Sequence, residues 1–270
     1  MSRRPVPEFK PDGFLAFQWR RLMTGLCWAC FGLGGLGLTL TWFPWINAVE
    51  KDPTRRVRRA RAVIAASFRL FMRLCEVLGV ARYDVEDVRA LRKVRGAIIV
   101  ANHPTILDYV LICSQLPGMD CLVKAELTRN FFLKGVVRAA DYLLNNQSEE
   151  ILGDCRTRLG RGDNILIFPE GTRTVPGRPL KLKRGVAHIA LRLGRPLQVV
   201  HIRCSGRWLD KSSAWWEIPR TRPVITLRMG EPINPADFLR EGEEGYSLAS
   251  RRLTRELTRV LSINNENNPK

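Results

Sequence analysis

The strongest hydrophobic pattern in the chain is a stretch without any charged residue, from Leu22 to Ile46. At about 25 residues it is long enough to cross ~30 Å of hydrocarbon as a helix. Trp42 and Trp45 lie near one end, and tryptophan is enriched where a helix meets the membrane–water interface. Glycines and Pro44 interrupt the helical pattern. The stretch therefore predicts either one transmembrane helix or a helical hairpin embedded in one leaflet.

Basic residues flank this stretch on both sides. Arg20 and Arg21 precede it, and a longer basic cluster follows it. The positive-inside rule places the richer flank on the cytoplasmic face of a membrane. Basic residues on both sides also suit a hairpin that enters and leaves by one face, so we favour embedding from one side. The following cluster consists of Lys51, Arg55, Arg56, Arg58, Arg59 and Arg61.

Apolar residues recur at spacings of three and four after Pro53, which predicts an amphipathic basic helix over residues 51–80. Two placements remain open for its arginines. They lie beside anionic lipid headgroups, or they form the solvated face of a helix that packs against the rest of the protein. The apolar stripe comprises Val57, Ala60, Ile64, Phe68, Phe71, Leu74 and Leu78.

From about residue 95 onward, short apolar runs alternate with helical segments. This alternation predicts an α/β domain over residues 95–262, with a mixed, mostly parallel sheet flanked by helices. Residues 1–21 form a basic N-terminal segment, residues 22–46 are the membrane-embedded part, and residues 263–270 form a polar tail that we expect to be disordered. The predicted strands are Ala97–Ala101, Cys121–Val123, Ile165–Phe168, Leu197–Ile202 and Val224–Leu227. The predicted helices are 104–116, 128–140, 148–160, 184–193 and Leu248–Leu261.

Composition adds a strong positive charge to this picture. The chain carries 44 Lys and Arg against 26 Asp and Glu, a formal net charge of +18. Such a surface attracts phospholipid headgroups, nucleic acid or an acidic carrier protein. A non-enzymatic basic binder is thus a separate hypothesis, although the apolar stretch argues against free nucleic-acid binding. The odd number of cysteines, 7, argues against a disulfide framework and for a reducing compartment.

A first candidate chemical motif occupies residues 102–108, directly after an apolar run that reads as a buried strand. Pro104 suits the first position of a helix, which would place His103 at the exposed entrance of that helix. His103 is a candidate general base near neutral pH. From a non-helical cap position its ring can turn back to meet Asp108, which would hold the imidazole in one tautomer. A capping histidine beside an unrelated surface aspartate is the competing interpretation.

A second candidate motif is Phe168-Pro169-Glu170-Gly171-Thr172-Arg173. It occupies the end of the predicted buried strand Ile165–Phe168 and the residues after it. Pro169 ends the strand pattern and Gly171 permits a tight turn. The planar donor fork of Arg173 suits phosphate recognition, and Glu170 could accept hydrogen bonds from a polyol acceptor. A solvated turn with a local ion pair is the competing interpretation.

Two further groups of side chains invite structural interpretations. His188 lies within an apolar helical pattern and is read as a packed or surface histidine, and no histidine has the spacing of a metal site. Trp208, Trp215 and Trp216 occur in a polar segment. They either form the lip of an apolar channel, dip into a membrane interface or pack in the core.

Taken together, the two motifs resemble the glycerolipid acyltransferase family, which contains the bacterial 1-acylglycerol-3-phosphate acyltransferases. The family's first block, Asn-His-x4-Asp, and its third block, Phe-Pro-Glu-Gly-Thr-Arg, are both present here. The resemblance covers roughly residues 95–230. The matching residues are Asn102, His103, Asp108, all of Phe168–Arg173, the stretch Lys124-Ala125-Glu126-Leu127, and Lys183-Arg184-Gly185.

The resemblance implies an acyl-CoA or acyl-carrier-protein donor, a lysolipid acceptor and a membrane-docked N-terminus. It implies that His103 is the catalytic base with Asp108 beside it, and that acceptor binding falls to Glu170, Gly171, Thr172, Arg173 and Lys183. No metal and no bound cofactor are implied. We therefore expect an O-acyltransferase at the cytoplasmic face of the inner membrane, among membrane phospholipids and without a nucleic-acid partner.

One departure from the family pattern concerns the acceptor. The second block of the family normally carries an arginine that helps to hold the acceptor's phosphate, and Asn146 stands about where it is expected. A neutral amide cannot replace a bidentate cation on a dianion. Either Arg138, Arg156 or Arg173 compensates, or the acceptor belongs to a specialised lipid pathway and is not a phosphomonoester. A thioesterase, in which water replaces the acceptor, is a third possibility.

Overall fold

The sheet forms the centre of the molecule. The computed structural model describes residues 10–123, 129, 134–144, 150–175, 177–241 and 245–262. Within these, a 7-stranded sheet has the order β1-β7-β6-β2-β5-β3-β4, in which every neighbouring pair is parallel except β6 with β7. The predicted mixed, mostly parallel sheet is confirmed. The strands are β1 Arg82–Val85, β2 Ile98–Ala101, β3 Asp120–Val123, β4 Leu143–Leu144, β5 Ile165–Ile167, β6 Leu197–Cys204 and β7 Val224–Ile233.

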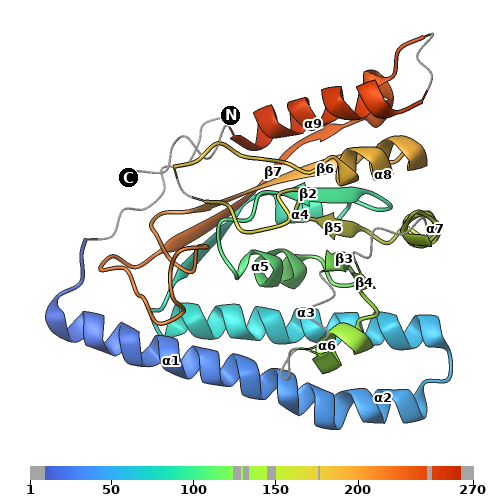
Figure 1. Cartoon of the computed structure of the whole chain (residues 1–270). Coiled ribbons are helices and arrows are strands. Elements are labelled where there is room, and N and C mark those ends of the chain that lie inside the picture. The colour runs from blue at the N-terminus through green and yellow to red at the C-terminus, as the bar shows by residue number, and fades with distance from the viewer. Residues whose placement is uncertain are drawn as a thin grey trace.

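Helices cover both faces of the sheet, as parallel strands require (Figure 1). The alternation of side chains along β2 shows how the two faces are filled. Ile98 and Val100 pack with helices α7, α8 and α9, whereas Ile99 and Ala101 pack with α1, α3 and α5. The helices of the domain are α4 Val88–Leu91, α5 Asp108–Gln115, α6 Lys134–Ala139, α7 Glu150–Gly160, α8 Gly185–Leu193 and α9 Ser247–Ser262.

Most predicted elements of the domain are found, but their limits differ in places. The predicted helix over 104–116 begins four positions late, because residues 105–107 form a turn before α5. The sequence pattern did not indicate β1 or β4. β1 is a partly exposed edge strand with polar Arg82 and Asp84, and β4 has only 2 residues. The predicted disordered tail lies outside the described residues.

The N-terminal apolar stretch belongs to one long helix. α1 (Phe14–Gly37) continues through a π-helical stretch, Leu38–Trp42, into α2 (Phe43–Val49). Pro44 does not end the helix. It comes directly after the π-helical stretch, and the wider turn there leaves room for a ring that would otherwise meet the preceding turn.

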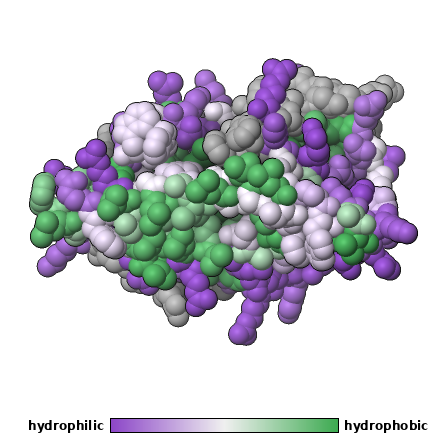
Figure 2. All heavy atoms as spheres, turned by 90° about the horizontal axis from the view of Figure 1, so that it is seen from below, coloured by the Kyte–Doolittle hydropathy of each residue, from purple (hydrophilic) through white to green (hydrophobic). Residues whose placement is uncertain are grey.

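The outer side of this long helix is apolar. Leu15, Trp19, Leu22 and Leu33 are among its exposed side chains. Figure 2 shows apolar side chains gathered in a band on the underside of the molecule, where Figure 1 places α1 and α2. In the described parts of the chain, Phe14–Val49 is the one helical segment long and apolar enough to cross a membrane, and only 11% of its most apolar window is buried. A core helix of a soluble protein would be mostly buried.

α3 (Pro53–Val77) turns back along α1 and lies between α1 and α5 (Figure 1). Asp52 caps its start by accepting hydrogen bonds from the amides of Thr54 and Arg55, at 2.8 and 3.2 Å. A hairpin therefore exists, but it is formed by α1–α2 with α3 and not within residues 22–46. The inner face of α3 packs on α1 and α5.

Two arginines of the basic flanks point into the protein and not towards a lipid surface. Arg20 is buried and forms an ion pair with Asp12. Arg61 of α3 is also buried, and its Nη2 lies 2.7 Å from Oδ2 of Asp120 on β3. The prediction that the arginines of the helix over 51–80 face headgroups or solvent is wrong for Arg61, because its partner Asp120 is buried.

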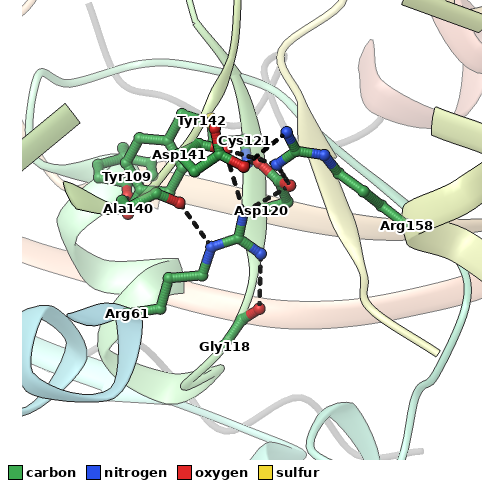
Figure 3. Close-up of polar contacts among 9 residues, drawn as sticks. All are labelled: Arg61, Tyr109, Gly118, Asp120, Cys121, Ala140, Asp141, Tyr142 and Arg158. Carbon is green, nitrogen blue, oxygen red and sulfur yellow. Dashed lines mark hydrogen bonds and ion pairs between the residues drawn. The ribbon is translucent and has the colours of Figure 1, made fainter. Parts of the chain in front are cut away.

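The Arg61–Asp120 ion pair is the centre of a larger polar cluster (Figure 3). Arg158 of α7 forms a second ion pair with Asp120. Arg61 also donates to the carbonyl oxygens of Ala140 and Asp141, at 2.8 and 3.2 Å. One buried carboxylate therefore links α3, β3, α7 and the turn before β4.

Replacing Arg61 with Ala should lower the free energy of unfolding by about 3–5 kcal/mol, since it removes one partner of a buried carboxylate. Arg58→Ala is the matched control, because Arg58 is exposed on the same helix. It should change stability by about 0.5 kcal/mol or less. Chemical denaturation in detergent, followed by circular dichroism, measures both. Equal effects of the two substitutions would contradict a structural role for the cluster.

Candidate active site

Asn102 sets the position of the first motif. It follows β2 directly, and its side chain is buried. Nδ2 donates to the carbonyl oxygen of Ile202 at 2.7 Å, and Oδ1 accepts from the amide of Ile202 at 2.8 Å. The side chain thus adds one more pair of hydrogen bonds to those that join β2 and β6. Its role is to hold the end of the strand, so that His103 leaves the sheet at its carboxyl edge.

His103 and Asp108 meet as the spacing predicted, but a different local structure brings them together. His103 Nδ1 lies 2.9 Å from Oδ2 of Asp108. Pro104 is not the first residue of a helix. Instead, Thr105 turns the chain by donating its amide to Oδ2 and its hydroxyl to Oδ1 of Asp108, at 2.7 and 2.6 Å. Asp108 then begins α5.

Burial raises the pKa of the Asp108 carboxyl, while the hydrogen bonds from His103 and Thr105 act in the opposite direction. A carboxylate at Nδ1 selects the tautomer in which Nδ1 carries the proton. Nε2 then has a lone pair, and no described residue donates to it. The imidazole is stacked on the ring of Phe168, with centroids 4.2 Å apart, and lines a cavity.

Glu170 joins the second motif to the first. Its Oε1 accepts hydrogen bonds from the amide of His103 at 3.1 Å and from the hydroxyl of Thr174 at 2.7 Å. The amide of Thr174 in turn donates to the carbonyl oxygen of His103 at 2.7 Å. Glu170 is buried, and burial raises its pKa. The prediction that Glu170 binds the acceptor remains a prediction, but the contacts observed here are with the backbone of His103.

Gly171 and Lys183 lie against each other. Gly171 has φ +64°, a conformation that residues with a Cβ rarely adopt, and a Cβ there would lie 2.8 Å from Cε of Lys183. The amide of Lys183 donates to the carbonyl oxygen of Pro169 at 2.8 Å. The Lys183 side chain therefore crosses the turn at Gly171. Thr172 is exposed beside them, and all three residues line the cavity.

Arg173 is held by a distant loop. Its Nη1 donates to the carbonyl oxygens of Leu209 and Asp210, at 3.0 and 2.6 Å. The side chain also lines the cavity. Because Nη1 donates to two backbone carbonyl oxygens, the direction of the guanidinium is fixed. The remaining N–H groups of the guanidinium can then donate hydrogen bonds to an anion.

The cavity beside His103 has a volume of about 1090 Å³ and combines an apolar interior with cationic residues. Its lining includes Trp28 of α1 and Phe68 of α3, so the N-terminal helices form part of the wall. Among the described residues, no aspartate or glutamate lines the cavity. The cationic residues of the lining are Arg173, Lys183 and Arg192, and the other apolar residues include Phe31, Tyr109, Val110, Leu122, Val136, Val137, Tyr142, Ile151 and Ile189.

The sequence analysis missed two residues of this cavity. His188 and Arg192 lie one turn apart on α8, and both line it. His188 Nε2 lies 3.2 Å from Oγ of Ser250 on α9. Burial lowers the pKa of His188, as do Arg192 and Arg184 nearby. The interpretation of His188 as only a packed or surface histidine was therefore incomplete, and its i, i+4 spacing from Arg192 was the available signal.

Several predicted motif residues cannot be compared with the structure. The stretch Lys124-Ala125-Glu126-Leu127 and residue Asn146 lie outside the described residues.

Sequence comparison identifies the domain that carries this site. Residues 82–203 match the sequence model of the Acyltransferase family. This region is an acyltransferase-family domain. The chain is also similar to two named 1-acyl-sn-glycerol-3-phosphate acyltransferases.

Human 1-acyl-sn-glycerol-3-phosphate acyltransferase beta is 30% identical to the chain over 165 residues, covering 56% of each protein. The coconut (Cocos nucifera) 1-acyl-sn-glycerol-3-phosphate acyltransferase is 30% identical over 159 residues, covering 56% of this chain and 50% of the relative. The chain thus spans about half the length of these relatives.

The fold of the acyltransferase domain also has a solved counterpart. The crystal structure of the 1-acyl-sn-glycerophosphate (LPA) acyltransferase PlsC from Thermotoga maritima superimposes with a TM-score of 0.66. The match covers 90% of this chain and 94% of that one, at 20% identity. It therefore extends over the N-terminal helices as well as the sheet.

Because Glu170 contacts the backbone of His103, we expect substitutions of Glu170 to change kcat more than KM. Glu170→Ala removes the acceptor for the His103 amide and should lower kcat of the acyltransferase domain by about 10- to 100-fold, with a smaller change in KM for the acceptor. Glu170→Gln keeps an acceptor oxygen and should retain most of the activity. Steady-state kinetics of both variants test this. A rise in KM with unchanged kcat would instead assign Glu170 to acceptor binding.

Proposed function

We propose that this protein is a membrane-bound O-acyltransferase that moves a fatty acyl group from a thioester donor to a hydroxyl of a lysophospholipid. The donor is acyl-carrier protein or acyl-CoA. The observation that carries the proposal is the His103–Asp108 pair, 2.9 Å apart, on the wall of a largely apolar cavity. The cavity offers space for an acyl chain beside a base.

The chemistry follows from the two ring nitrogens of His103. Asp108 holds the proton on Nδ1, so Nε2 accepts the proton of the acceptor hydroxyl as its oxygen attacks the thioester carbon. The tetrahedral intermediate then collapses, the carbon–sulfur bond breaks, and the thiolate takes the proton back from Nε2. The buried Asp108 stabilises the imidazolium between these two steps.

The cations of the cavity bind the anionic end of the substrates. Arg173, Lys183 and Arg192 line the wall with no carboxylate among the described lining residues. Phosphate oxygens satisfy such groups well, because charge-assisted hydrogen bonds are about twice as strong as neutral ones. These side chains offer the positive charge that the second block lacks at Asn146. A phosphomonoester acceptor is therefore compatible with this chain.

We place the protein on one side of the membrane, at the cytoplasmic face of the inner membrane. α3 runs alongside α1, so a crossing by α1 would carry α3 into the hydrocarbon as well (Figure 1). Exposed arginines such as Arg69 and Arg73, level with Phe31 in the middle of the helix, would then each cost about 2.5–3.5 kcal/mol near the bilayer centre. Lying in the interface avoids this cost while it buries the exposed apolar side of α1. Residues 95–262 then form the catalytic domain.

His103→Ala should abolish acyl transfer, with a loss of about 10²- to 10⁴-fold, because it removes the proton acceptor. Asp108→Asn should lower the rate while preserving the shape of the site. The assay follows donor consumption with acyl-carrier-protein and CoA thioesters against lysophosphatidic acid, a lyso-phosphodiester and a hydroxylated lipid without phosphate. Normal turnover by a folded His103→Ala protein would refute the assignment. Acylation of the lipid without phosphate alone would favour a specialised lipid pathway.

The cationic residues of the cavity predict that their substitution lowers activity only towards acceptors that carry a phosphate. Arg192→Gln and Lys183→Gln should each lower kcat/KM for lysophosphatidic acid by about 10- to 100-fold, since a hydrogen bond to a charged group contributes about 1.5–3 kcal/mol. Arg161→Gln, at an exposed position outside the cavity lining, is the control. The same loss with a phosphate-free acceptor would contradict acceptor recognition and would direct attention to the phosphates of the donor.

A further inference from the structure

The segment between β6 and β7 exposes two adjacent tryptophans. Trp215 and Trp216 are 56% and 62% exposed, and their rings meet edge to face with centroids 5.3 Å apart. Trp208 and Leu209, earlier in the same segment, are buried. The segment is therefore anchored in the core at one end and presents a large aromatic surface at its tip.

Local hydrogen bonds hold this tip in shape. Asp210 Oδ1 accepts from the amides of Ser212 and Ser213, at 2.7 and 2.8 Å, and from the hydroxyl of Ser212 at 2.8 Å. The amide of Glu217 donates to the carbonyl oxygen of Ala214 at 3.1 Å. The two indole rings thus lie on a structured loop. Little conformational entropy is therefore lost when they bind a partner.

The tip lies at the N-terminal end of α1. The amide of Asp12 donates to the carbonyl oxygen of Arg220 at 2.8 Å, and Arg20 Nη2 donates to that of Pro219 at 2.5 Å. The guanidinium of Arg220 lies 5.2 Å from the ring centroid of Phe17. Figure 1 shows the orange segment before β7 extending from the sheet towards this end of α1. The exposed residues Phe14, Leu15 and Trp19 belong to the same end of the helix.

The same segment is bonded to both motifs of the active site. The carbonyl oxygen of Leu209 accepts from the amide of Ile106, at 3.2 Å, and from Nη1 of Arg173, at 3.0 Å. Leu209 has φ +53°, a left-handed conformation that is unfavourable for a leucine. Such strain persists only where surrounding contacts over-determine it. Leu209 therefore fixes the position of the tryptophan segment relative to His103 and the cavity.

We infer that Trp215 and Trp216 are a second lipid-contacting point, in addition to the apolar side of α1–α2, and that their partner is an anionic membrane surface. Tryptophan favours the interface, where its ring is apolar and its N–H is hydrated. The exposed charged residues of segment 205–223 are Arg207, Lys211 and Arg220 against Glu217, so its charge suits acidic headgroups. The exposed apolar residues at the start of α1 continue this surface.

Contact at both α1–α2 and the tryptophan pair fixes the orientation of the cavity relative to the membrane. A single helix lying in the interface would not fix it, because the protein could rotate about the helix axis. Lipid contact at the tryptophans is transmitted through Leu209 to Ile106 and Arg173, both of which line the cavity. Contact with a membrane therefore holds the site in position for a lipid acceptor. This consequence for activity rests on the proposed acyl transfer, whereas the membrane contact itself does not.

The binding test uses the full-length protein without donor and vesicles of phosphatidylethanolamine with and without phosphatidylglycerol. The double variant Trp215→Ser/Trp216→Ser should bind the anionic vesicles at least fivefold more weakly in flotation. Brominated lipid should quench the wild-type fluorescence more than that of the double variant. Leu248→Ser is the matched control, since Leu248 is similarly exposed on α9, across the sheet from α1. Unchanged binding and quenching in the double variant would overturn the inference, whether or not the protein transfers acyl groups.

The activity test compares two forms of the acceptor. Transfer to a lysolipid in vesicles should fall at least tenfold in the double variant, while transfer to a monomeric short-chain acceptor stays within twofold of wild type. An equal fall with both acceptors would show a structural role and overturn the inference. A fall seen only with the carrier-protein donor, with normal vesicle binding, would assign the tryptophans to a protein partner instead. Absence of transfer by the wild type would refute the proposed function and leave the binding test standing.

Discussion

Glu170 reaches the backbone amide of His103 because β2 and β5 are adjacent and parallel, so that the residues after each strand emerge at the same edge of the sheet. Every other feature of the site depends on this placement. Glu170 accepts from the amide of His103, Thr174 donates to its carbonyl oxygen, and its ring packs on Phe168. Backbone contacts thus fix the main chain of His103, and Asp108 orients its ring. A side chain positioned in this way loses little entropy when a ligand binds.

A second constraint joins the N-terminal helices to the domain. Asp120 is fully buried, and such a carboxylate is tolerated only with partners. Arg61 and Arg158 both contact its Oδ2, so α3 cannot separate from the sheet without removing one of the two partners of a buried charge. α3 in turn carries α1 and places Phe68 in the cavity wall. The exposed apolar side of α1 and the cavity beside His103 are therefore parts of one packed unit.

Much of the fold was predictable because its signals are local. The apolar runs at β2, β3, β5 and β6 and the helical periodicity of α3 and α9 are readable from neighbours a few residues apart. The errors have identifiable causes. Pro104 was read as a helix start, but Thr105 builds a turn on Asp108 that competes with a helix at that point. Arg61 was read as a surface residue because its partner Asp120 is distant in sequence. The partial interpretation of His188 has the same origin, since helical spacing alone does not reveal the cavity beside it.

By itself, the sequence determined which residues are chemically competent: a histidine with an aspartate five positions later, a carboxylate and a cation around a glycine turn, and a long apolar helix with basic flanks. These depend on residue type and short spacing, which the chain carries directly. Only the tertiary structure decided what each of them faces. It turned Glu170 towards the His103 backbone, tied Arg173 to Leu209, and placed Arg192 in the cavity wall. The physical reason is that contacts between residues distant in the chain are set by the order of the strands and the packing of helices on them, and no local pattern encodes that arrangement.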